Sequence, residues 1–301
     1  MKQAVYKFIY NANVNIVLRN LNKWLLPLLP SKIKLPPSGV MKVKNHEGLV
    51  LKIRTNQTSY LTKLIFWEGG YLRFEYTDIF IRLIKKVSTF YDIGANIGYY
   101  SLVAAIENKN INVVGFEPAS GPLFYFKENT RLNNFTNIKI EPIALSHQTG
   151  EIEFYEIKNH KYKYLEHNLA GEGNAGSNTT GRNFVVRKVP TTTLDNYVKT
   201  NTVSSIDLIK MDTEGTENLI LEKASLVLKT MKPIIICETI FNTTEPELER
   251  IMKSYGYELY DHVGNGLIKQ ESIIRNENNG VSNCFFVHPS KFHLINEFVI
   301  N

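Results

Sequence analysis

The sequence predicts an α/β protein with a mostly parallel sheet, helices on both faces of that sheet, and an N-terminal extension. Between residues 89 and 255, short runs rich in β-branched and aromatic residues alternate with amphipathic helical segments, a pattern typical of βαβ units. The chain has 301 residues, of which 43% are hydrophobic, so a large core can form. A glycine-punctuated turn in FYDIGANIGYYSL, residues 90–102, connects the first strand of the series to its helix. Open α/β sheets bind ligands at such turns.

The elements follow in chain order. The extension contains a segment of partly helical spacing, a hairpin, and a helical region broken by two glycines, at residues 9–29, 40–54 and 61–86. Strands are then predicted at 89–93, 111–116, 138–143, 206–211 and 233–237. Helices are predicted at 99–107, 122–133, 217–229 and 245–255. Two more β-like runs, at 151–157 and 184–189, flank a glycine-rich loop.

These elements divide the chain into an N-terminal extension, residues 1–85, and a ligand-binding domain, residues 86–301. The glycine-rich loop, at about residues 158–182, is an insertion in that domain. Such a loop is either a linker or a lid over a binding site. We favour a lid, because long loops in compact domains are commonly functional.

The charge of the chain is concentrated near its beginning. The net charge is +6, and no acidic residue precedes Glu47, so the first segment is a basic arm. Asparagines at positions 11, 13, 15, 20 and 22 interrupt its apolar residues, which argues against a membrane span, and the pattern of a signal peptide is missing. Two interpretations are open. The arm packs on the domain or on a second subunit of a homodimer, or it contacts a membrane surface or a partner protein.

Partners and compartment follow from the same composition. No recognised nucleic-acid-binding module is present, so we expect no nucleic-acid partner. Cys237 and Cys284 lie in apolar contexts without metal-ligand spacing, and we expect buried thiols in a reducing environment. The expected location is the cytoplasm, with attachment to the inner face of the membrane left open by the basic arm.

Asp92 precedes the first glycine of the turn by two residues. The turn, Gly94 to Gly98 with Ala95 and Asn96 inside it, has GxxxG spacing and not the GxGxxG of dinucleotide-binding proteins. A buried carboxylate beside a pyrophosphate would face a like charge in a low dielectric. We therefore expect a ligand with positive charge and no phosphate. S-adenosylmethionine meets this condition, and its own carboxylate can bind the amides of the turn.

Glu117 ends the second strand, in VVGFEP, and Pro118 follows it. An acidic side chain at this place can accept hydrogen bonds from both hydroxyls of an adenosine ribose. Taken singly, Asp92 could cap a helix and Glu117 could lie on the surface. Their order and spacing together predict a nucleoside site.

Acidic residues also gather at the ends of two later strands. Asp212 and Glu214 follow the fourth strand in IDLIKMDTEGTE, and Glu238 ends the next strand. These carboxylates can deprotonate a hydroxyl, hold a divalent cation, or bind a polyol. Capping and salt-bridge roles are the structural alternative. The candidate general bases are Asp212, Glu214 and His147, the last of which follows the third strand.

Six segments in this order resemble the FkbM family of S-adenosylmethionine-dependent methyltransferases. They are FYDIGANIGYYSL, VGFEP, IALSHQTGEIEFY, VPTTTLDNYV, IDLIKMDTEGTE and PIIICE. The resemblance implies a Rossmann-like class I methyltransferase sheet whose last strand, expected at residues 283–287, is antiparallel. It also implies cofactor contacts by Asp92, Gly94, Ala95, Asn96, Gly98, Glu117, Pro118, Ala144 and Asp212. Ser146 and His147 stand where the family often has an acidic residue.

The activity that the resemblance implies is O-methylation of a hydroxyl on a sugar, a glycan or a natural product, for instance in polysaccharide biosynthesis. We expect residues 158–182 to cover the acceptor, with Asn174, Ser177 and Glu238 as substrate contacts and Asp212, Glu214 and Glu238 as ligands of an optional divalent metal. Two alternatives are an NAD-dependent oxidoreductase, which the GxxxG spacing disfavours, and a non-catalytic nucleoside-binding scaffold in a membrane-associated glycan assembly.

Overall fold

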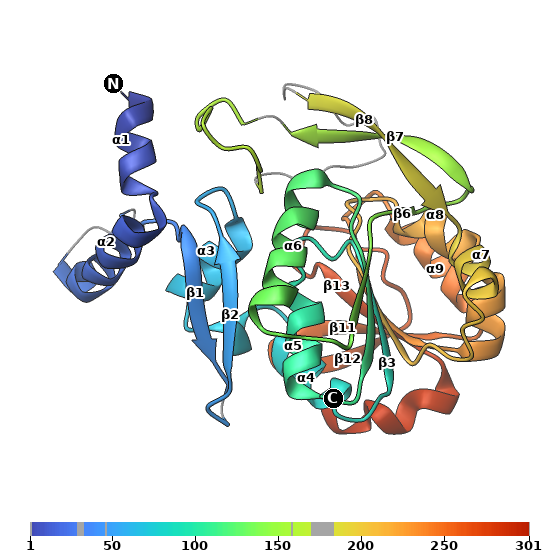
Figure 1. Ribbon diagram of the computed structural model, residues 1–301. Coiled ribbons are helices and arrows are strands. Elements are labelled where there is room, and N and C mark those ends of the chain that lie inside the picture. The colour runs from blue at the N-terminus through green and yellow to red at the C-terminus, as the bar shows by residue number, and fades with distance from the viewer. Residues whose placement is uncertain (1, 29–32, 46, 158, 170–183, 301) are drawn as a thin grey trace.

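A large mixed sheet forms the centre of the molecule (Figure 1), here described from a computed structural model. The structure describes residues 2–28, 33–45, 47–157, 159–169 and 184–300. The eight strands, in their order across the sheet, are β12 (Gly266–Gln270), β11 (Glu258–Val263), β13 (Asn283–Val287), β10 (Ile234–Glu238), β9 (Leu208–Met211), β3 (Thr89–Ile93), β4 (Asn112–Phe116) and β5 (Ile138–Glu141).

Five neighbouring strands, from β5 to β10, are parallel, as the βαβ pattern predicts. Strand β13 pairs antiparallel with β10, so the prediction of an antiparallel last strand at residues 283–287 is confirmed. The hairpin of β11 and β12 extends the sheet beyond β13. The sequence analysis did not predict this hairpin, which turns at Gly264.

Helices cover both faces of the sheet (Figure 1). One face carries α4 (Thr77–Ile84), α5 (Tyr99–Glu107) and α6 (Ser120–Leu132), and the other carries α7 (Leu194–Thr200), α8 (Glu217–Glu222) and α9 (Glu245–Ser254). Strand residues alternate between the two cores: Phe90 and Ile236 belong to the first, Tyr91 and Ile235 to the second. This alternation is the expected period of two.

The helix predicted at residues 217–229 is wrong in its length. Helix α8 ends at Glu222, and a separate π-helical turn covers Val227–Met231. The Asp195 carboxylate accepts hydrogen bonds from the amides of Leu226 and Val227 at 2.8 and 3.1 Å. These bonds start a new helical turn, because they satisfy amides that have no partner in the preceding turn.

The extension packs into the same core as the sheet. Its hairpin, β1 (Gly39–Lys44) and β2 (Val50–Thr55), is antiparallel as predicted, and α3 (Tyr60–Trp67) follows. Leu51, Ile53 and Ile65 share one hydrophobic cluster with Phe90 of the sheet. The division at residue 85 stays a prediction, but the hydrophobic core is continuous across it.

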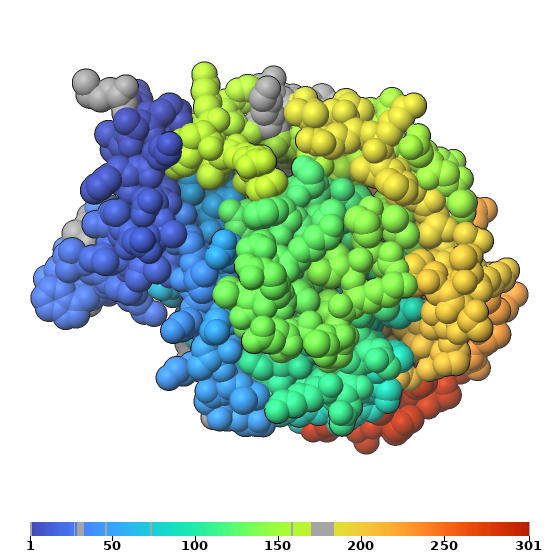
Figure 2. All heavy atoms as spheres, viewed as in Figure 1, coloured from blue at the N-terminus to red at the C-terminus, as the bar shows by residue number. Residues whose placement is uncertain are grey.

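Two helices, α1 (Lys2–Ile9) and α2 (Ala12–Leu25), precede the hairpin and lie at one edge of the molecule (Figure 2). Short 3-10 turns cover Leu26–Leu28, Tyr71–Arg73, Pro289–Leu294 and Asn296–Phe298. No helix in the described ranges is long and apolar enough to cross a membrane.

A second, three-stranded sheet lies above the carboxyl ends of the central strands. Its strands are β6 (Ala144–Leu145), β8 (Phe184–Thr192) and β7 (Gly150–Ile157), with β7 and β8 antiparallel. The predicted β-like runs at 151–157 and 184–189 are these last two strands. Of the predicted lid, the structure describes only residues 159–169.

Candidate functional site

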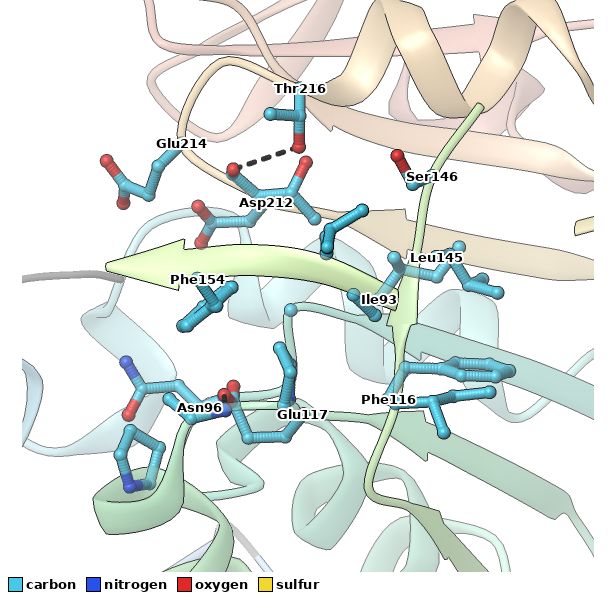
Figure 3. A pocket seen from close by; sticks show the side chains of 18 residues that line it. Ile93, Asn96, Phe116, Glu117, Leu145, Ser146, Phe154, Asp212, Glu214 and Thr216 are labelled. Atoms are coloured by element: carbon cyan, nitrogen blue, oxygen red, sulfur yellow. Dashed lines mark hydrogen bonds between the residues drawn. The ribbon is translucent and has the colours of Figure 1, made fainter. Parts of the chain in front are cut away.

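A pocket opens at the carboxyl ends of β3, β4 and β9 and is bordered by β6 and β7, which carry Leu145 and Phe154 (Figure 3). Its lining comes from four parts of the chain, and comprises Ile93, Gly94, Asn96, Phe116, Glu117, Pro118, Ala119, Pro122, Ile143, Ala144, Leu145, Ser146, Ile152, Phe154, Asp212, Thr213, Glu214 and Thr216. This is where ligands bind in open α/β sheets.

The glycine turn brings two strand ends into direct contact. A Cβ atom on Gly94 would lie 1.9 Å from the carbonyl oxygen of Asp212, and Gly94 has a φ of +73°. The amides of Gly94 and Ala95 donate to the carbonyl of Phe116 at 3.1 and 3.0 Å. Only glycine fits this close approach, which holds the ends of β3, β4 and β9 together. Gly94 and Asn96 line the pocket, whereas Ala95 and Gly98 do not.

Glu117 is 6% exposed and lines the pocket. Its Oε2 accepts a hydrogen bond from the amide of Asn96 at 2.7 Å, and its Oε1 accepts one from the amide of Ala119 at 2.8 Å. Burial raises the pKa of Glu117 to about 7, although these two amides and Lys210 oppose the shift. Both carboxylate oxygens retain a lone pair for a ligand hydroxyl.

Asp92 does not line the pocket. It is fully buried, and its Oδ2 accepts hydrogen bonds from the amide and hydroxyl of Ser101 at 3.0 and 2.7 Å. Its Oδ1 lies 3.9 Å from Nζ of Lys210. Burial raises the pKa of Asp92, and Lys210 and Ser101 counteract this shift. The structure thus places Asp92 beneath the turn, where it joins β3 to α5 and β9.

Lys210 is a buried cation between the glycine turn and Asp212. Its Nζ donates to the carbonyl of Gly94 at 3.1 Å and to Oδ2 of Asp212 at 3.2 Å. Burial by itself lowers the pKa of Lys210, but the Asp212 and Asp92 carboxylates outweigh it and the pKa is raised. Lys210 therefore fixes one oxygen of Asp212, and that residue also lines the pocket.

The structure brings Asp212, Glu214 and Glu238 together. One carboxylate oxygen of each lies within 4.8 Å of the others, a spacing that one divalent cation can bridge. Glu238 belongs to this group but does not line the pocket. Glu217, in contrast, is fully buried and accepts hydrogen bonds from the amides of Thr213 and Gly215, so it shapes the loop that carries Glu214.

The remaining predicted residues fall into three groups. Pro118 and Ala144 line the pocket. His147 is exposed and outside its lining, with Nδ1 3.2 Å from the hydroxyl of Ser146. Asn174 and Ser177 lie outside the described residues.

Several lining residues were missed by the sequence analysis. Leu145 is the last residue of β6, and Ser146 directly follows it. Ile152 and Phe154 belong to β7. The alternation of β7 was a signal for Ile152 and Phe154, since residues two apart share a face. The sequence alone could not show that this face covers the carboxyl ends of strands in another sheet.

Comparison with known proteins assigns the chain to a family. A family model described as the methyltransferase FkbM domain matches residues 92–259, more than half of the chain. The chain belongs to the FkbM methyltransferase family. The family assignment and the mostly parallel sheet confirm the family and the fold class that the sequence motifs predict. No curated protein sequence matches this FkbM-family chain.

Solved structures similar to the FkbM-family chain include several methyltransferases. Methyltransferase FkbM from Methylobacillus flagellatus KT is 14% identical with a TM-score of 0.44, over 75% of this chain and 47% of that one. The chain thus spans about half the length of that protein. M. jannaschii TYW2 in complex with AdoMet is 13% identical with a TM-score of 0.37, over 83% of this chain and 87% of that one. A precorrin-6y C5,15-methyltransferase from Geobacter metallireducens GS-15 is 11% identical with a TM-score of 0.39, over 70% and 86% of the two chains.

The pocket of this FkbM-family chain is acidic. Glu117, Asp212 and Glu214 line it, and none of the described lining residues is basic. Figure 3 shows Glu117 on one side of the pocket and Asp212 and Glu214 on the other. Such a lining favours a cationic ligand and opposes a phosphate group.

A second hollow adjoins the pocket and shares Ala119 and Pro122 with it. Its charged and amide side chains come from β7, β8 and the described part of the insertion, and are Glu156, Asn159, His160, Lys163, Glu166, Asn168 and Arg187. Glu156 accepts hydrogen bonds from the amide and hydroxyl of Ser120 and from Arg187. In the FkbM-family chain, the insertion therefore contributes a polar surface beside the pocket.

Proposed function

We propose that the protein is an S-adenosylmethionine-dependent O-methyltransferase that acts on a hydroxyl of a sugar, a glycan or a natural product. The observation that carries the proposal is the charge of the pocket. Three carboxylates and no basic side chain line its described part, at the ligand-binding end of a parallel sheet. Nicotinamide dinucleotides carry a pyrophosphate, which this lining repels. Membership of the FkbM methyltransferase family agrees with methyl transfer.

The described residues fit S-adenosylmethionine. Glu117, with both oxygens held by backbone amides, would accept the ribose hydroxyls. Ala144, Leu145 and Phe154 provide apolar walls for the adenine ring. Asp212 and Glu214 would lie near the positive charges of the cofactor. When bound, S-adenosylmethionine supplies a methyl group that its sulfonium already activates.

The residues of the chain then have two tasks, which are to align the acceptor oxygen and to remove its proton. Asp212 and Glu214 are the base candidates that line the pocket. One of these carboxylates would accept the proton of the acceptor hydroxyl. Lys210 donates to Oδ2 of Asp212 at 3.2 Å and so orients that carboxylate. His147, exposed and outside the lining, ranks behind both.

The second hollow supports a hydroxyl-rich acceptor. Carboxylate, amide and cationic groups around it can bind the hydroxyls of a sugar from several directions. Asn174, Ser177 and Glu238 remain proposed acceptor contacts. A divalent cation at Asp212, Glu214 and Glu238 remains an optional part of the proposal, which a chelator tests. The buried thiols of Cys237 and Cys284 agree with a reducing compartment, and we propose the cytoplasm.

The first experiment is titration calorimetry of the purified protein with S-adenosylhomocysteine and, separately, with NAD. We expect binding of the first and none of the second. Glu117→Gln should weaken binding by about 10-fold to 100-fold, because hydrogen bonds to a charged acceptor contribute about 1.5–3 kcal/mol. Glu153→Gln, at an exposed position of β7, is the control and should bind as the wild type does.

Binding of NAD alone, or equal binding by Glu117→Gln and the wild type, would overturn the proposed cofactor. With the cofactor established, transfer of a labelled methyl group to a panel of sugars and polyols tests the acceptor class. The same assay with EDTA tests the metal. Transfer that is unaffected by the chelator would remove the cation from the proposal.

A further inference from the structure

Helix α2 buries two polar side chains against the protein and exposes a stripe of apolar ones. Asn15 and Arg19, both polar, are 0% and 4% exposed. Val17, Leu21 and Trp24, all apolar, are 65%, 49% and 76% exposed. A surface helix of a globular protein normally buries its apolar stripe and exposes its polar one. The apolar face of α2 therefore has another role than core packing.

The buried polar face is held by specific hydrogen bonds. Arg19 donates to the carbonyls of Ser38 and Val40 at 3.0 and 2.7 Å. Asn15 accepts from the amide of Ser38 at 2.7 Å and donates to the carbonyl of Pro36 at 3.2 Å. Because these groups are buried and bonded, rotation of the helix would leave them without partners at a cost of about 1–3 kcal/mol each. The outward direction of the apolar face is thus fixed.

The outward residues form one continuous stripe. Val17, Leu21, Trp24 and Leu28 are spaced by four, three and four residues, which places them on one side of a helix, opposite Asn15 and Arg19. Leu28, in the 3-10 turn that follows α2, is 81% exposed. Phe8 of α1 is also exposed, and a shallow hollow lined by Phe8, Lys7 and Val14 joins α1 to α2.

Charge selects the partner of this stripe. The first 46 residues contain no acidic residue, and Lys2, Lys7 and Lys23 of the two helices are exposed. A second copy of the chain that met this surface face to face would bring like charges together. Exposed leucine and tryptophan next to lysines are instead the composition of helices that lie in a membrane interface.

We propose that α1 and α2 form a docking surface for an anionic lipid bilayer, on which α2 lies flat with Val17, Leu21, Trp24 and Leu28 among the lipid headgroups. This inference does not depend on the methyltransferase activity. Contacts between α1 and the insertion connect the surface to the rest of the molecule. Gln3 donates to the carbonyl of Lys161 at 2.9 Å, and the rings of Tyr6 and Tyr10 meet that of Tyr162 at 5.2 and 5.5 Å. Figure 2 shows residues of the insertion lying against the arm.

Co-sedimentation of the full-length protein with vesicles tests this surface. We expect binding to vesicles of phosphatidylcholine and phosphatidylglycerol, weakened by salt, and little binding to phosphatidylcholine alone. Leu21→Gln should lower the vesicle affinity about tenfold, and Leu21→Gln combined with Trp24→Gln should lower it about 100-fold. Lys2→Gln combined with Lys7→Gln should lower it about fivefold for each lysine.

Ile274→Gln is the matched control, because Ile274 is 50% exposed and Leu21 is 49% exposed. We expect this control to bind vesicles as the wild type does. All of these variants should keep the wild-type affinity for S-adenosylhomocysteine and the wild-type thermal midpoint, since the polar face of α2 is unchanged.

Three outcomes would overturn the proposal. The first is that the wild type fails to bind anionic vesicles at low salt. The second is that Leu21→Gln and Ile274→Gln bind these vesicles equally well. The third is that sedimentation velocity shows a dimer of the wild type that Leu21→Gln dissociates, which would assign the stripe to a second copy of the chain.

Discussion

The carboxylate of Glu117 connects the glycine turn, the end of β4 and the pocket. Because burial raises its pKa to about 7, the charged form, which we propose accepts the ribose hydroxyls, becomes the major form only above that pH. We therefore expect the affinity for S-adenosylhomocysteine to rise between about pH 5.5 and pH 8, with its midpoint near 7. Calorimetry over this range measures the dependence. Glu117→Gln should show a nearly flat profile, and an equally steep one would assign the titration to another group.

The same shift affects stability in the opposite direction. In the unfolded chain Glu117 titrates near its ordinary pKa, so between that value and about 7 the folded protein binds more protons than the unfolded one. The contribution of Glu117 to the free energy of unfolding thus falls as pH rises through this window. As pH rises through this window, the expected ligand affinity increases while the contribution of Glu117 to stability decreases. Such a trade-off is common at functional sites.

The position of a residue at the pocket was predictable where a motif defines it and unpredictable where the strand face decides. Gly94, Asn96, Glu117 and Asp212 line the pocket, and their roles as cofactor contacts stay predictions. Asp92 shares the face of Phe90, which packs under α4 and α5, whereas its neighbour Ile93 lines the pocket. A shift of one residue in a strand changes the face, and the sequence does not show which face the ligand occupies. The inference against phosphate finds its support in the acidic lining residues and not in Asp92.

Asp92 of β3 connects its own strand to two other elements, since it accepts hydrogen bonds from Ser101 of α5 and lies 3.9 Å from Lys210 of β9. We expect Asp92→Ala to lower the free energy of unfolding by about 3 kcal/mol, the lower end for loss of a buried charge partner. Denaturant unfolding measures the loss. Ser101→Ala, which removes one hydrogen bond, should cost about 1 kcal/mol. A stable Asp92→Ala protein without cofactor affinity would instead give Asp92 a direct role in binding.

At helix α2 the sequence shows the pattern but not its direction. The spacing of Val17, Leu21 and Trp24 is visible in the sequence, yet an apolar stripe normally predicts a core-facing side. The carbonyls of Ser38 and Val40, which bind Arg19, become available only once the chain has returned past the helix. Arg19 is thus a structural anchor, and the exposed lysines carry the positive charge of the arm.

In the whole molecule, the core between the sheet and helices α4 and α5 is continuous across the predicted boundary at residue 85. We therefore expect the extension and the sheet to unfold together. Trp24 and Trp67 are the two tryptophans, and Trp67 is buried in the extension. In the Trp24→Phe protein, the fluorescence of Trp67 should follow the same denaturation curve as far-UV circular dichroism. An earlier fluorescence transition would show that the extension is a separate folding unit.

At this scale the sequence predicted the parallel part of the sheet and missed its edge. The βαβ alternation defines five parallel strands with few alternative connections, and the structure has them. The hairpin of β11 and β12 and the sheet of β6, β7 and β8 follow no such repeat. Their positions depend on tertiary packing, and β6 and β7 supply Ala144, Leu145, Ile152 and Phe154 to the pocket lining.

Strands β10 and β13 place Cys237 directly opposite Cys284, and both side chains are fully buried. Burial raises the pKa of each thiol, so neither forms a reactive thiolate while the sheet is closed. A thiol reagent can therefore modify the native protein only during an opening of its central strands. The rate of that modification therefore measures how often the central strands open, and any ligand that stabilises the closed sheet will slow the modification.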